Sequence, residues 1–187
     1  MGEKLERFAA VSNSLTGTFP WTTPSPKFNR VRLSENRLTG TLPWTDIAKF
    51  PSLIVIEMRE NELEGGLDDA MGQLTTLIRM DLQWNQLTGT IPTAIGNLTD
   101  IISLQLGGNQ LSGTLPSELG NLRNLEQLIL NDNYSLNGTI PTELAELSKL
   151  GKFYMFYRMA GYGAAEPLSK LNDFLCLNQY APLFTPT

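Results

Sequence analysis

Apolar and polar residues alternate in short stretches of this chain, and each stretch ends near an asparagine. Leu104 and Leu106 precede Asn109 in this way, with a glutamine between the two leucines. Such an alternation predicts a short β-strand with one buried face. The asparagine recurs at intervals of 23, 25, 24, 24 and 24 residues, at Asn13, Asn36, Asn61, Asn85, Asn109 and Asn133. The chain is therefore built from six copies of one unit.

The recurring asparagine lies where each strand turns away from the sheet. Its side-chain amide offers both donors and an acceptor. Placed inside the turn, it can bond backbone groups of its own coil and of the next coil, so that the column satisfies polar groups that water cannot reach. We expect these six residues to form a buried structural ladder with no catalytic role.

A second pattern follows each asparagine, and Leu87, Gly89, Ile91 and Pro92 are one example of it. The second leucine points inward. Glycine permits a left-handed backbone or a close approach between coils, and proline suits the first position of a helical turn. One or two helical turns, each burying two apolar residues, are therefore predicted after the proline at 93–98, 117–122 and 142–147.

One strand per unit predicts a parallel sheet on the inner wall of a solenoid. A period of about 20–29 residues, with leucines at fixed offsets, indicates leucine-rich repeats. The expected fold is an α/β solenoid: a right-handed superhelix with a parallel β-sheet on the concave face and short helical or 3-10 turns on the convex face. Six full repeats and a partial seventh are expected to occupy residues 1–158, and an irregular cap or tail residues 159–187.

The segment Leu111-Ser112-Gly113-Thr114-Leu115-Pro116 and its copies resemble the plant-type leucine-rich repeats. Proteins of that family include the ectodomains of receptor-like kinases and the polygalacturonase-inhibiting proteins. The resemblance spans residues 5 to about 155. It implies a binding module and a location at the cell surface or outside the cell. It is much more specific for fold than for function.

Three units depart from this template, and so do the ends. Asp68 replaces the proline of the third unit, and Tyr134 adds a residue to the sixth, whose turn must bulge. The outer segment of the first unit, 21–27, is too rich in proline for a helix. Cys176 is the only cysteine, so the paired-cysteine caps of the family are missing.

Composition and charge exclude several classes of function. The 14 basic and 19 acidic residues leave a net charge of −5, whereas a nucleic-acid surface needs a basic stripe. With no histidine and a single cysteine, hydrolase triads and metal-ligand spacings are absent from the sequence. We expect no enzyme activity, no cofactor and no metal. No apolar run is long enough to span a membrane.

The candidate binding residues are the variable strand positions, which are expected to point outward from the concave face. About 21 such positions match the roughly 20–30 residues per side of a standard interface. Tryptophan is enriched at interface hot spots, although packing against the Glu60 and Gly108 coils would also explain the tryptophan of this set. The candidates are Arg30, Arg32, Glu57, Arg59, Arg79, Asp81, Gln83, Trp84 and Gln105.

The sequence therefore predicts a non-catalytic recognition module that binds a protein, peptide or glycan on its concave face, as part of a cell-surface or extracellular receptor-like protein. A stand-alone inhibitor of a wall-degrading enzyme, or an ice-binding repeat protein, is the alternative. A threonine column would favour ice binding, but it also belongs to the repeat template: Thr18, Thr41, Thr90, Thr114 and Thr139.

Overall fold

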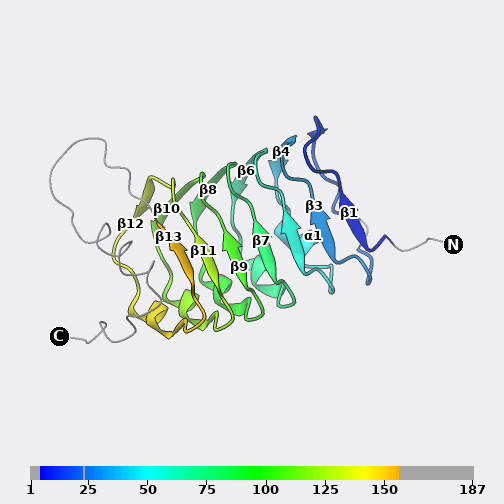
Figure 1. Ribbon diagram of the computed structural model, residues 1–187. Coiled ribbons are helices and arrows are strands. Elements are labelled where there is room, and N and C mark those ends of the chain that lie inside the picture. Colours follow the sequence, from blue (N-terminus) through cyan, green and yellow to red (C-terminus); the bar gives the residue numbers. More distant parts are fainter. Residues whose placement is uncertain (1–4, 23, 156–187) are drawn as a thin grey trace.

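A computed structural model describes residues 5–22 and 24–155, and within them the chain winds as a regular solenoid. Seven short strands, all parallel, lie side by side along it (Figure 1). Their order in the sheet is their order in the chain: β1 (Arg7–Ala9), β3 (Arg30–Arg32), β5 (Val55–Glu57), β7 (Arg79–Asp81), β9 (Ser103–Gln105), β11 (Gln127–Ile129) and β13 (Lys152–Tyr154). The predicted leucine-rich-repeat solenoid is confirmed.

A second parallel sheet is formed by the segments that carry the glycine of each repeat. The sequence pattern did not predict that these segments pair. The strands are β2 (Thr16–Gly17), β4 (Arg37–Thr41), β6 (Glu62–Gly66), β8 (Gln86–Thr90), β10 (Gln110–Thr114) and β12 (Ser135–Asn137). Each coil thus contributes one strand to each sheet before it reaches the outer wall.

The outer wall consists of short helical turns, as the pattern after the proline predicts. One is a single α-helical turn and four are 3-10 turns: α1 (Trp44–Ile47), η1 (Asp69–Gln73), η2 (Thr93–Asn97), η3 (Ser117–Asn121) and η4 (Thr142–Glu146). Ile95 and Leu98 of the fourth coil are fully buried, and so are Leu119 and Leu122 of the fifth. Two apolar residues per turn close the core from this side.

The leucine columns form one continuous core along the solenoid. Met80, Leu82 and Leu87 of the fourth coil are 0% exposed, and the equivalent residues of the fifth coil are buried to the same degree. Each coil therefore covers its neighbours, which is how a repeat array obtains stability without a single compact core.

The third and sixth units absorb their departures locally. The carboxylate of Asp68 accepts a hydrogen bond from the Ala70 N–H at 2.7 Å and so caps η1 where other units have proline. In the sixth unit the Leu136 N–H donates to the Asn133 carbonyl at 3.1 Å. This turn takes up the extra residue, as predicted from the sequence.

The first coil is less covered than the others. Its outer segment, described for residues 18–22 and 24–29, contains no helical turn and instead buries Trp21 and Phe28. Core-type side chains of this coil remain exposed, with Leu5 at 54%, Phe8 at 36% and Leu15 at 39%. The expected cap or tail at 159–187, together with Cys176, lies outside the described residues.

Candidate binding surface

The asparagine ladder holds the strands that carry the candidate residues. Asn85 donates from Nδ2 to the carbonyl oxygens of Met58 at 3.0 Å and Leu82 at 3.1 Å, and its Oδ1 accepts from the Leu63 N–H at 3.0 Å. Each internal asparagine thus bonds its own coil and the coil before it, not the next coil as expected from the sequence. Asn36, Asn61, Asn109 and Asn133 make the equivalent bonds.

Asn13 differs from this set. It is exposed, and its Nδ2 donates to the Val11 carbonyl of its own coil at 2.9 Å. The expectation of a buried bridging role is wrong for this position, because the first coil is the edge of both sheets in the described part of the chain.

A group of ion pairs crosses coils two to four on the face of the seven-stranded sheet, called the sheet face below. Glu57 receives Arg32 on one oxygen at 3.0 Å and Arg79 on the other at 3.7 Å. Both arginine side chains are close to half exposed (45% and 44%), whereas that of Glu57 is 21% exposed. The guanidinium groups therefore keep N–H donors available to a partner.

Arg59 and Glu60 form a separate pair near the ends of the strands. Arg59 donates to one oxygen of Glu60 at 2.7 and 3.0 Å, and both side chains are about half exposed. Ion pairs at this exposure contribute little to stability, typically 0.2–1 kcal/mol. Their charges remain accessible for recognition.

Arg30 is less exposed than its position in the sequence pattern suggested. It lies in β3 on the sheet face, and its Nε is buried without a hydrogen-bond partner among the residues that the structure describes. The side chain of Arg30 is therefore partly packed into the surface, and Arg32 is the exposed arginine of this strand.

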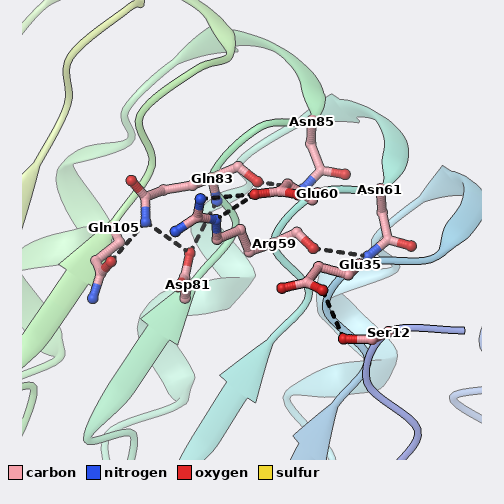
Figure 2. A network of polar contacts seen from close by, with 9 residues as sticks. All are labelled: Ser12, Glu35, Arg59, Glu60, Asn61, Asp81, Gln83, Asn85 and Gln105. Atoms are coloured by element: carbon pink, nitrogen blue, oxygen red, sulfur yellow. Dashed lines mark hydrogen bonds and ion pairs between the residues drawn. The ribbon is translucent and has the colours of Figure 1, made fainter.

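Gln83 links Asp81 and Gln105 in a chain of hydrogen bonds beside the Arg59–Glu60 ion pair (Figure 2). Gln83 donates from Nε2 to Asp81 Oδ1 at 3.3 Å and to Gln105 Oε1 at 2.7 Å. Gln105 in turn donates to the Ser103 hydroxyl at 2.8 Å. The predicted exposure of Gln83 and Gln105 is wrong, because they bond to one another across two coils and are only 7% and 8% exposed.

Asp81 is the titratable group that this environment changes. Burial raises its pKa, while the hydrogen bonds from Gln83 and the charges of Arg59 and Arg79 act in the opposite direction. The Gln83 N–H also donates to Oδ1 at 3.2 Å, so one carboxylate oxygen is held by two donors. This carboxylate can accept a hydrogen bond or a cation from a ligand, but its surroundings oppose its ionisation.

Trp84 lies at the end of the strand, next to the ladder asparagine, and its side chain is 46% exposed. Its φ is +54°, in the left-handed region, as at the equivalent residues Ser12, Glu35, Glu60 and Asp132. The next equivalent residue is Gly108. A Cβ atom there would lie 2.5 Å from Cε3 of Trp84, so the indole ring lies against the bare backbone of the neighbouring coil.

The structure thus divides eight of the nine candidates among four places, and Arg30, whose Nε is buried, joins none of them. Arg32, Glu57 and Arg79 meet in ion pairs; Asp81, Gln83 and Gln105 meet in the hydrogen-bonded chain; Arg59 turns to Glu60; and Trp84 packs on Gly108. Sequence reasoning missed Ser103 as an end of the polar chain. A serine in a column of longer side chains was the available signal.

Metal binding and membrane crossing find no support in the part of the chain that the structure describes. Within residues 5–22 and 24–155 there is no group of three histidine, cysteine, aspartate or glutamate side chains that could hold a metal ion. The same residues contain no helix of the length and apolarity that crossing a membrane requires.

The family model described as Leucine Rich Repeat matches residues 76–98 and 100–122, which belong to the fourth and fifth coils. A comparison with curated protein sequences gives no match.

Several solved structures are similar. The plant peptide hormone receptor RGFR1 in complex with RGF2 has a TM-score of 0.78 and 31% identity over 81% of this chain and 24% of that chain. The ectodomain of the receptor kinase GASSHO1/SCHENGEN3 from Arabidopsis thaliana, in complex with CASPARIAN STRIP INTEGRITY FACTOR 2, has a TM-score of 0.77 and 34% identity over 81% and 18%. The SOBIR1 ectodomain from Arabidopsis thaliana gives 0.67 and 28% over 72% and 74%. The chain spans a quarter or less of the length of the first two receptor chains.

Proposed function

We propose that this chain, which belongs to the plant-type leucine-rich-repeat family, is a non-catalytic recognition module that binds a peptide or protein partner on its sheet face. The observation that carries the proposal is the set of half-exposed arginines on the rigid strands of coils two to four, Arg32, Arg59 and Arg79. Two of the similar receptor structures are complexes, one with RGF2 and one with CASPARIAN STRIP INTEGRITY FACTOR 2.

The charges of this surface suit a partner with both signs of charge. Arg79 and Arg32 converge on Glu57, and a ligand carboxylate can replace Glu57 as acceptor for either guanidinium without moving the strands. Planar guanidinium groups recognise carboxylates through two parallel hydrogen bonds. Asp81, two residues along the strand from Arg79, then offers an acceptor to a ligand amide or amine.

Rigidity supports the same conclusion. The strands are bonded to both neighbouring coils, and the internal asparagines join successive turns. Buried Gln83 and Gln105 are held in place by each other and by Ser103. A surface that is already ordered loses little conformational entropy on binding, and this favours affinity.

The receptor context belongs to the proposal as well. Because the chain corresponds to only a part of the length of the similar receptors, we infer that its recognition surface works within a larger cell-surface or extracellular protein. Sequencing of the complete transcript tests this inference. A membrane span or a kinase domain in the same reading frame supports a receptor, whereas a complete product without either supports a stand-alone inhibitor.

Ice binding gains no support from the threonine column. Thr41 and Thr90 are exposed, but the row between them is interrupted by Gly66, with Glu62 and Glu64 beside it on the same strand. The threonine methyl also has a use within the fold: a Cβ at Gly113 would lie 2.9 Å from Cγ2 of Thr90, so the methyl packs where the glycine leaves room.

The binding proposal is tested by selecting peptides from a displayed random library against the intact chain. Selected peptides are then titrated against Arg79→Glu, Arg59→Glu and, as a matched control, Arg123→Glu, whose arginine is 58% exposed and paired with Glu146 away from the sheet face. We expect a loss of about tenfold or more for the first two and none for the control. Peptides that bind all three variants equally would refute the sheet-face assignment.

A further inference from the structure

We propose a second binding site, for a neutral sugar ring, at the end of the strands in coils four to six, where Trp84 offers a flat aromatic face beside Asn131, Asp132 and Tyr134. The site shares only coil four with the peptide surface of coils two to four, and it uses none of the arginines of that surface. It rests on the packing of Trp84 and on the polar groups of the sixth coil, and it does not depend on the peptide-binding proposal.

Two glycines determine the position of the indole ring. The backbone N–H of Trp84 donates to the Gly107 carbonyl at 2.9 Å, and the backbone N–H of Gly108 donates to the Asn131 carbonyl at 2.8 Å. The sheet-type pairing of coils therefore continues up to this point. Because Gly108 has no side chain, Cε3 and Cδ2 of Trp84 occupy the space where a Cβ would be. The ring therefore lies along the surface toward the fifth coil.

One face of this ring remains available to a ligand. Trp84 is 46% exposed, whereas Trp21 and Trp44 are 4% and 3% exposed. The left-handed backbone at this position disfavours a bulky residue and is better suited to glycine or asparagine. The turn itself therefore gives no reason for a tryptophan. An exposed indole can stack against the apolar face of a ligand ring, and this role would explain a tryptophan at the position.

The polar groups lie on the sixth coil, on the far side of Gly107 and Gly108 from Trp84. Asp132 accepts on one oxygen from Asn131 Nδ2 at 2.6 Å and on the other from the Tyr134 hydroxyl at 3.0 Å. Oδ1 of Asn131 points at Gly107, where a Cβ would lie 2.8 Å away. A carboxylate has about four lone-pair sites, so both oxygens of Asp132 can accept further bonds from hydroxyl groups.

The spacing and the charge select the ligand. Successive coils are about 4.8 Å apart, so a ring stacked over Trp84 and Gly108 would bring its edge hydroxyl groups above the sixth coil, within reach of the Asp132 carboxylate and the Asn131 amide. A sugar ring has this combination: an apolar C–H face and a rim of hydroxyl donors. Glu60, one coil before Trp84 in the row, is paired with Arg59, but Asp132, two coils after it, leaves a carboxylate beside the ring that disfavours acidic sugars.

The test uses Trp84 as its own reporter, because it is the exposed tryptophan of the three. Neutral β-glucan, mannan and xylan oligosaccharides are titrated at up to millimolar concentration while quenching of the intrinsic fluorescence by acrylamide is measured. We expect at least one neutral oligosaccharide to protect Trp84 from the quencher and to shift its emission to the blue. Oligogalacturonate, the anionic comparison, is expected to protect it much less.

Variants then assign the site by calorimetry with the oligosaccharide that protects best. Trp84→Ala is expected to weaken binding about tenfold or more, whereas Trp84→Phe retains most of it because an aromatic face remains. Asp132→Gly removes the carboxylate without straining the left-handed backbone and is expected to weaken binding several-fold. Ile78→Ala, on the same coil with a similar exposure of 38%, is the matched control and is expected to bind unchanged.

Absence of protection by every neutral oligosaccharide would overturn the proposal. So would full affinity in Trp84→Ala, or equal protection by oligogalacturonate. Peptide binding is measured separately with Arg79→Glu, so the sugar site can fail while the peptide surface holds, and the reverse.

Discussion

Replacement of Asn109 by leucine removes one rung of the asparagine ladder from the middle of the solenoid. Asn109 is 5% exposed. Its Nδ2 donates to the carbonyl oxygens of Leu82 and Leu106, each at 3.0 Å, and its Oδ1 accepts from the Leu87 N–H at 3.0 Å. Leucine has a similar size but can make none of these bonds.

The cost depends on which partners are left without a bond. The Leu82 carbonyl also accepts from Asn85, and the Leu106 carbonyl also accepts from Asn133, so both keep one donor. The Leu87 N–H loses its acceptor within the core. One buried unsatisfied donor costs about 1–3 kcal/mol, and the two weakened carbonyls add to it. We therefore expect the free energy of unfolding to fall by about 2–3 kcal/mol.

Urea denaturation followed by circular dichroism and by tryptophan fluorescence measures this change, and agreement of the two probes checks that unfolding is two-state. Asn97→Leu is the matched control, since Asn97 is exposed on the outer wall at the end of η2. We expect the control to change stability by at most about 0.5 kcal/mol. Equal losses in the two variants, or a loss below 0.5 kcal/mol for Asn109→Leu, would refute the role assigned to the ladder.

Three further predictions concern the sheet face and its rim. Gly108→Ala places a Cβ 2.5 Å from Trp84 at a φ of +67°, so the free energy of unfolding should fall by about 1–3 kcal/mol. The double variant Gly108→Ala, Trp84→Ala should recover part of this loss, and no recovery would mean that the indole ring does not clash with the new Cβ. Gln105→Ala breaks the chain from Gln83 to Ser103 and should cost about 1–2 kcal/mol, whereas Gln127→Ala on the neighbouring strand should stay within about 0.5 kcal/mol. Burial raises the folded-state pKa of Asp81, so the folded state binds the Asp81 proton more tightly than the unfolded state does, and the charged carboxylate destabilises the fold most at neutral pH. Asp81→Asn should therefore stabilise the protein at pH 7, and this gain in the free energy of unfolding should shrink as the pH falls to about 4. A gain that does not depend on pH would contradict this sign.

The sequence alone determined the repeat and most of what the repeat implies. Leu104, Leu106 and Leu111 recur at fixed offsets, so their burial, the strand before Asn109 and the helical turn after Pro116 follow from local pattern. The same physics acts in each coil, and six copies of one weak signal become a strong one. Even the departures at Asp68 and in the sixth unit could be located, because the template shows where a residue is replaced or added.

The candidate site could be located in outline but not in detail. All nine candidates lie in the strands, or at the strand ends, that the pattern indicated, yet exposure was wrong for Gln83 and Gln105. Their burial depends on whether a side chain of one coil finds a partner on the next, and a pattern within a single coil does not contain that information. Asn13 shows the same limit, because its ladder position matters only where another coil precedes it.

Tertiary structure alone decided the contacts between coils. The second parallel sheet exists because adjacent glycine-bearing segments stack in register, and Trp84 lies flat because the residue one coil later is Gly108. The convergence of Arg32 and Arg79 on Glu57 brings together residues that are 47 positions apart in the chain. A solenoid repeats its backbone from coil to coil, so its core can be read along the chain, whereas its surface chemistry runs across the coils and is set only when they stack.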